Sequence, residues 1–203
     1  HYPLRRQRQM CIRDRNSGAL PATSIADGAG LGAPFDYTGA AYPGTAGDCG
    51  VSLAAGATCT IEVQFIPSGV GLATDTIVLN YDDGAAPAVM NHNIQGTGAL
   101  PANITITEAD PYDFGPITEN ATTSHVFTLT NTGGVSATAI AEIGLGAPFD
   151  FVGGTFPGTA GTCTPTLANA GTCDIEIEFA PVSTGLLTDT ISIQYDNGAT
   201  VVT

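Results

Sequence analysis

Apolar and polar residues alternate along several short segments of this chain. In residues 173–179 every second position is apolar, and three acidic residues occupy the positions between. Residues 59–65 repeat the pattern, with Thr60, Glu62 and Gln64 on the polar side, and residues 77–81 and 191–195 alternate as well. A period of two predicts antiparallel strands that have one face on a core and the other in water. Glycine, proline, asparagine and aspartate separate the segments, as expected for an all-β protein.

The pattern occurs twice because the chain contains an internal repeat. The sequence GLGAPFD stands at residues 30–36 and again at 144–150, an offset of 114 residues. Across residues 30–84 and 144–198, 31 of 55 positions are identical. A period of this length suits a whole domain rather than a solenoid repeat. We therefore expect two copies of one module, with the boundary in the Gly/Pro-containing segment 96–102.

The two copies differ at their outer ends. The second copy has candidate opening strands at 103–107, 113–117 and 124–130, and the first copy has no counterpart of them. The first copy ends with residues 91–98, and the second has no matching strand. We expect a window from a longer array, with a truncated module at 16–98 and another at 99–203.

Residues 1–15, HYPLRRQRQMCIRDR, have a different composition from the rest of the chain. They contain all five arginines, and the chain has no lysine. The segment resembles translated library-adapter sequence, and it lacks the apolar stretch of a signal peptide. We expect a non-native or disordered leader that packs poorly. The alternative is a native basic arm that binds an acidic surface.

The remaining chain is strongly acidic, since it carries 18 of the 19 Asp and Glu residues and no Lys or Arg. Such a surface repels nucleic acid and anionic lipid, so neither is expected as a partner. No run of 18 apolar residues occurs, and no membrane insertion is expected in this segment.

The order of motifs resembles a known family. The second copy reads Asp113-Phe-Gly115, then FTLTNTG at 127–133, Cys163, GTC at 171–173 and Phe179-Ala-Pro181, with Gly185 after it. This resembles the bacterial choice-of-anchor D type of repeat, related to Hydin-like (ASH) immunoglobulin-like domains. The resemblance implies tandem immunoglobulin-like antiparallel β-sandwiches in secreted or surface-anchored proteins, without enzymatic activity. The anchoring signal of such proteins is not visible in this sequence.

Each copy carries one cysteine pair with a spacing of ten residues. The pairs are Cys49 with Cys59 and Cys163 with Cys173. We expect a disulfide within each copy, which implies an oxidising compartment. On the chain-entropy model each bond stabilises the fold by about 2.5–3 kcal/mol. The alternative is a metal site, but no histidine lies nearby to complete a zinc site.

Carboxylates in turns and near the boundary are the candidate ligands of a metal ion. Hard oxygen ligands near a module junction could bind calcium. Otherwise these side chains are surface groups that keep the protein soluble. The calcium candidates are Asp82, Asp83, Asp110, Asp113 and Asp196.

The sequence offers no catalytic constellation, and no cofactor is expected apart from calcium. His92 and His125 lie in non-equivalent segments and read as structural residues, and no nucleophile-elbow, zinc-protease or phosphate-loop motif occurs. We therefore expect a non-catalytic spacer of an extracellular or cell-surface protein whose partners are neighbouring repeats. The alternatives are an adhesion module that binds calcium, a glycan or a surface protein, and an accessory domain of a secreted hydrolase.

Overall fold

The protein is built almost entirely from antiparallel β-strands. The computed structural model describes residues 8–203, and within this range the helical structure is one 3₁₀ turn, Thr38–Ala40. The chain divides into two compact units between Ala99 and Leu100. The described residues up to Ala99 are the first unit, and residues 100–203 are the second unit.

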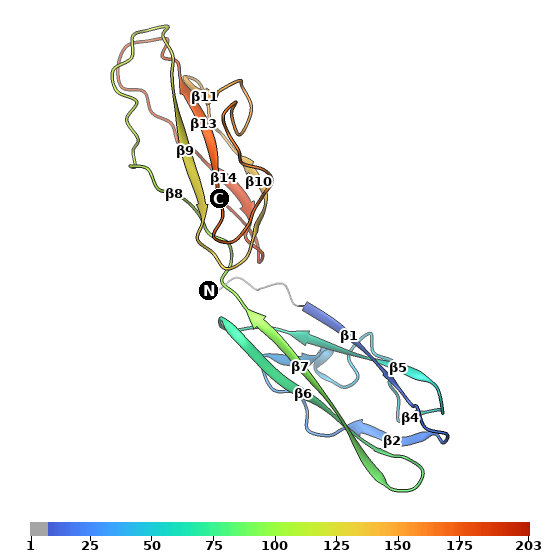
Figure 1. Ribbon diagram of the computed structural model, residues 1–203. Helices are drawn as coiled ribbons and strands as arrows, with labels where there is room; N and C mark the ends of the chain where they lie inside the picture. The colour runs from blue at the N-terminus through green and yellow to red at the C-terminus, as the bar shows by residue number, and fades with distance from the viewer. Residues whose placement is uncertain (1–7) are drawn as a thin grey trace. The chain divides into compact units, whose positions relative to one another are not determined.

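The first unit consists of two sheets with a core between them (Figure 1). Ile61, Val63 and Ile77 have no exposed surface, so the inward positions of the alternating pattern form this core. One sheet has the order β1 (Arg8–Arg15), β5 (Thr58–Phe65) and β3 (Phe35–Tyr37). The other has the order β4 (Ser52–Leu53), β2 (Ala22–Asp27), β6 (Gly71–Asp82) and β7 (Pro87–Gly98).

The second unit repeats this plan around Leu129, Ile175 and Ile177. One sheet has the order β11 (Phe149–Phe151), β13 (Thr172–Phe179), β9 (Thr123–Asn131) and β8 (Ile104–Ile106). The other has the order β12 (Thr166–Leu167), β10 (Ala137–Glu142), β14 (Ile193–Asp196) and β15 (Val201–Val202). The predicted all-β fold with tandem antiparallel sandwiches is confirmed.

The segment 113–117 is not a strand, contrary to its prediction. Instead, the Phe114 ring packs against Phe149 and Phe179, with ring centroids 5.9 and 5.7 Å apart. Asp113 accepts a hydrogen bond from the Gly115 amide, which has a positive φ of 75°. This backbone conformation is incompatible with a regular strand and closes a turn.

Residues 8–15 form a paired strand, so the prediction of a disordered, poorly packed leader is wrong for them, whereas their non-native origin stays a prediction. They form β1, which pairs with β5 along its whole length, from Arg8 opposite Phe65 to Arg15 opposite Thr58 (Figure 1). Met10 and Ile12 are half-buried against the core, whereas Cys11 and Arg13 are exposed. Residues 1–7 of the same prediction lie outside the described residues.

β1 occupies in the first unit the place that β9 occupies in the second. Thr58 of β5 lies opposite Arg15, and the equivalent Thr172 of β13 lies opposite Thr130. The two registers agree position by position, although the strands have unrelated sequences. The backbone ladder is the same for any residues, so a strand needs only a matching inward pattern to fill this place.

Candidate functional site

Both predicted disulfides are present, and each closes a similar loop. Cys49 bonds to Cys59 and Cys163 bonds to Cys173, with Cα–Cα distances of 4.9 and 4.8 Å. All four cysteines are buried. Each bond ties the end of an irregular segment to β5 or β13. We call these segments, residues 38–49 and 152–163, the cysteine loops, and we treat them as the candidate site because both copies build them alike.

A buried glutamate holds the first cysteine loop. Alternation predicts that Glu62 of β5 faces water, but the loop folds over it and leaves only 5 % of its surface exposed. Its carboxylate accepts hydrogen bonds from the Thr38 hydroxyl and from the Ala46 amide. These bonds, with the Thr38 hydroxyl as the larger influence, lower the pKa of Glu62 below its usual value. The wet-face prediction is therefore wrong for Glu62, because a loop covers it.

Close backbone packing completes the loop. The Glu62 amide donates to the Pro43 carbonyl at 2.8 Å. Gly44 lies so close to this strand that an added Cβ would come within 2.8 Å of the Glu62 Cβ. Its φ of +95° also disfavours any other residue. The glycine is thus required both for space and for backbone conformation.

The second cysteine loop has the same construction. The Glu176 carboxylate accepts a hydrogen bond from the Ala160 amide at 2.9 Å, and the Glu176 amide donates to Pro157. A Cβ at Gly158 would lie 2.9 Å from the Glu176 Cβ. The Ser124 hydroxyl of β9 is the side-chain donor to Glu176, as the Thr38 hydroxyl is to Glu62. The two cysteine loops are therefore two copies of one structural motif, in which a strand glutamate and a closely packed glycine hold the loop.

Each loop packs one aromatic ring against the strand that precedes it. Tyr42 packs edge-on against Tyr37 of β3, with centroids 5.6 Å apart, and Phe156 packs in the same way against Phe151 of β11 at 5.4 Å. The Tyr37 hydroxyl donates to Asp27 at 2.8 Å. Burial, with a smaller contribution from Asp27, raises the pKa of Tyr37, and burial raises that of Tyr42.

The exposed positions of the loops carry small side chains. In the first loop they are Gly39, Ala40, Ala41, Thr45, Ala46 and Asp48, and in the second they are Gly153, Gly154, Thr155, Thr159, Ala160 and Thr162. Asp48 accepts a hydrogen bond from the Thr60 amide, so it too serves the loop itself. Protein-binding surfaces are anchored by Trp, Tyr and Arg, and none of these is exposed in either loop.

The calcium candidates are engaged in their own turns. Asp82, Asp113 and Asp196 each accept a hydrogen bond from the amide two residues ahead. Asp83 accepts hydrogen bonds from the Ala86 and Ala85 amides, which lower its pKa. Among residues 8–203, no three His, Cys, Asp or Glu side chains gather in a way that could hold a metal ion. The structure does not bring these candidates, including Asp110, into one site, and calcium binding stays a prediction.

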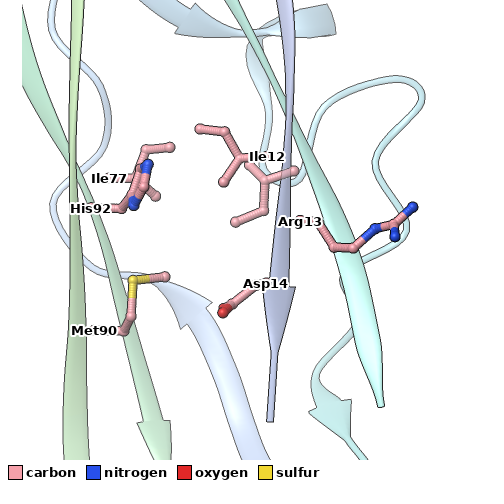
Figure 2. A pocket seen from close by; sticks show the side chains of 7 residues that line it. Ile12, Arg13, Asp14, Ile77, Met90 and His92 are labelled. Atoms are coloured by element: carbon pink, nitrogen blue, oxygen red, sulfur yellow. The ribbon is translucent and has the colours of Figure 1, made fainter. Parts of the chain in front are cut away.

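A small cavity of about 70 Å³ lies in the first unit between the two sheets. It is lined by Ile12, Arg13, Asp14, Ile61, Ile77, Met90 and His92 (Figure 2). Figure 2 shows Asp14 turned toward this cavity and Arg13 turned away from it. Pockets for small molecules measure about 300–1,000 Å³, so this space suits a water molecule rather than a ligand.

His125 lies in an aromatic cluster of the second unit. Its ring stacks on Tyr112 with centroids 4.0 Å apart, and its Nδ1 is 2.9 Å from the Tyr112 hydroxyl. Phe127 packs edge-on against the same ring at 4.8 Å. His125 is therefore a packed side chain of the core margin, as its isolated position in the sequence predicts.

Comparison with known proteins assigns no family to the chain. No protein-family model matches the chain, and no curated protein matches it. A solved structure described as a protein of unknown function from Porphyromonas gingivalis W83 is 13 % identical, and the match covers 85 % of this chain and 76 % of that one, with a TM-score of 0.31. A likeness at this level carries no functional argument. Within residues 8–203 no helix is long and apolar enough to cross a membrane. The two disulfides fit a protein of an oxidising, extracellular environment.

Proposed function

We propose that this chain is a non-catalytic spacer segment of a secreted or surface-anchored repeat protein of the choice-of-anchor D type. One observation carries the proposal: both cysteine loops pack an aromatic side chain inward, donate an amide hydrogen bond to a glutamate of the strand that they cover, and expose only small residues and the engaged Asp48. A binding loop would present anchor side chains outward. A repeated structural unit needs loops that stabilise the unit itself, and both cysteine loops have this property.

The disulfides support the same role. Each one locks the loop directly onto the central strand of its unit, with Cys59 in β5 and Cys173 in β13. Disulfides persist in oxidising, extracellular environments, and small secreted domains use them to supplement a limited hydrophobic core. The partners expected of a spacer are the neighbouring repeats of the same protein.

Single-molecule stretching of the full chain tests this proposal. A spacer should extend in two discrete unfolding events, one for each unit. Reduction should lengthen each extension by about 30 Å, because the ten-residue span inside each disulfide adds about 3.3–3.6 Å per residue when released. Smooth extension without discrete events would contradict a spacer role. Saturable binding of a glycan or protein that is abolished by Thr45→Arg with Thr159→Arg would favour the adhesion alternative.

A further inference from the structure

Two side chains of types that bind soft metal ions share one face of β7. The chain has two methionines and three histidines, yet Met90 and His92 stand only two positions apart. Met90 lies opposite Leu79, and His92 lies opposite Ile77, in the β6–β7 ladder. Leu79 and Ile77 are buried in the core, and directly opposite residues share one face of an antiparallel sheet. Met90 and His92 therefore both face the interior of the first unit.

The third contributor comes from the other sheet of this unit. Asp14 of β1 lines the same cavity of about 70 Å³ as Met90 and His92. Figure 2 shows the Met90 thioether and the Asp14 carboxylate directed toward each other across this cavity. The Arg15 amide donates a hydrogen bond to Oδ1 of Asp14 at 2.8 Å. This bond orients the carboxylate, and Oδ2 remains available to a cation.

The surroundings of His92 differ from those of His125. The His125 ring is packed against Tyr112 and Phe127, and its Nδ1 lies within hydrogen-bond distance of the Tyr112 hydroxyl. Among residues 8–203 the His92 ring has neither an aromatic neighbour nor a hydrogen-bond partner. Its nitrogens can therefore bind an ion at the cavity.

We propose that Met90, His92 and Asp14 form a binding site for a soft monovalent metal ion, namely copper(I). Thioether sulfur selects copper(I) over hard cations, and imidazole nitrogen is also a good copper ligand. The carboxylate offsets the charge of the ion. Because Met90 is unbranched and has three rotatable bonds, its sulfur can adjust to the ion. The site goes beyond the spacer role and does not depend on it.

Size and charge at the cavity favour a single soft cation. The space of about 70 Å³ is too small for an organic ligand, but it accommodates one ion. The net charge of −14 attracts cations to the chain, and the side chain of Arg13 is turned away from the cavity (Figure 2). Calcium requires six to eight oxygen ligands, and the lining side chains supply one carboxylate. The donor set therefore distinguishes copper(I) from calcium.

Titration of the isotopically labelled full chain with silver(I), a diamagnetic soft ion, and with copper(I) without oxygen tests the proposal. Both titrations use a Cys11→Ser background, because the exposed Cys11 thiol also binds soft metals. We expect saturable NMR shift changes at the Met90 methyl group and the His92 ring, and none at His125. In calorimetry the melting temperature of the first unit should rise by roughly 10 °C or more when the free ion is at 100 times its Kd.

Matched variants separate metal ligation from packing. Met90→Leu keeps the volume of the side chain and removes the sulfur, a change that cores tolerate. Met90→Leu and His92→Gln should each weaken silver(I) binding at least tenfold, and Asp14→Asn should also weaken it. Met10→Leu removes the other methionine that packs on this core and should leave the affinity unchanged. The melting temperature of each metal-free variant shows that it is folded.

Three outcomes would overturn the proposal. They are an absence of saturable shift changes at Met90 and His92, silver(I) binding by Met90→Leu that is as tight as in the parent, and an equal loss of affinity in Met10→Leu. Calcium binding at the same side chains that is tighter than silver(I) binding would likewise show that the site selects hard cations.

Discussion

Asp14→Leu should stabilise the first unit, because an aspartate occupies the place of a core leucine. In the shared register Asp14 lies opposite Cys59, and Leu129 lies opposite the equivalent Cys173. Leu129 has no exposed surface, whereas Asp14 is half-buried beside the cavity of about 70 Å³. The Asp14 carboxylate accepts a hydrogen bond from the Arg15 amide at 2.8 Å. It lines the cavity together with the apolar side chains of Ile12, Ile61 and Met90, and a leucine at this position would fill part of that space.

The magnitude follows from the area that leucine would bury. Complete burial of a leucine side chain contributes about 1.5–3 kcal/mol. Because Asp14 is already half-buried and the cavity is partly open, we expect an effect at or just below the lower limit of this range, about 1–1.5 kcal/mol. For a unit of this size each kcal/mol raises the melting temperature by roughly 4–8 °C. Differential scanning calorimetry should show this rise in one transition and no change in the other.

Two variants control for effects of hydrophobicity alone. Arg13→Leu on the exposed side of β1 should leave the free energy of unfolding within about 0.5 kcal/mol of the parent value, as surface changes usually do. Leu129→Asp, the reverse change in the second unit, should destabilise that unit by more than the 2–5 kcal/mol typical of Leu→Ala. If Asp14→Leu lowers the stability, or if Arg13→Leu raises it equally, β1 does not lie in the register of β9.

Three further predictions concern the same units. Deleting residues 1–15 should lower the melting temperature of the first unit by more than 5 °C and leave the second unchanged, since β5 loses its whole partner strand; a calorimetric shift of less than 2 °C would refute this role of β1. Replacing Cys49 and Cys59 by alanine should cost about 2.5–3 kcal/mol in urea unfolding, and an unchanged midpoint would mean that the bond does not form. Because the pKa of Glu62 is lowered in the fold, its contribution to stability is complete above its unfolded value of 4.5 and is lost as the pH falls through the lowered pKa; Glu62→Gln should therefore flatten the acid-side decline measured by circular dichroism, and a parallel curve would refute the assignment.

The repeat explains why much of the fold could be predicted from the sequence. Period-two alternation identified β5, β13 and the inward face of β6, because these strands are central and their faces differ sharply in burial. The cysteine pairs were predictable because partners close in sequence occur at identical positions in two copies. The segment 113–117 was wrongly predicted to be a strand. The sequence shows an apolar Phe114, but it does not show that this ring packs on Phe149 and Phe179 from an irregular segment.

Alternation could not predict that the cysteine loops fold over Glu62 and Glu176. Alternation describes the two faces of a sheet, and it does not include a loop that folds back over the polar face. The available signal was identity: Glu62 and Glu176 match between copies, while Gln64 and Glu178 do not. A polar residue retained at one position while its neighbours change indicates a specific partner, and here the partner is the amide of Ala46 or Ala160.

β1 shows the limit of composition as evidence. Its arginines set residues 8–15 apart from the acidic chain, yet Met10 and Ile12 alternate with exposed residues and pack inward. Main-chain hydrogen bonds do not depend on side-chain identity, so an unpaired edge accepts a segment that supplies two apolar residues at a spacing of two. The alternation of apolar residues fails at Asp14, where an acidic residue takes an inward position and lines a cavity.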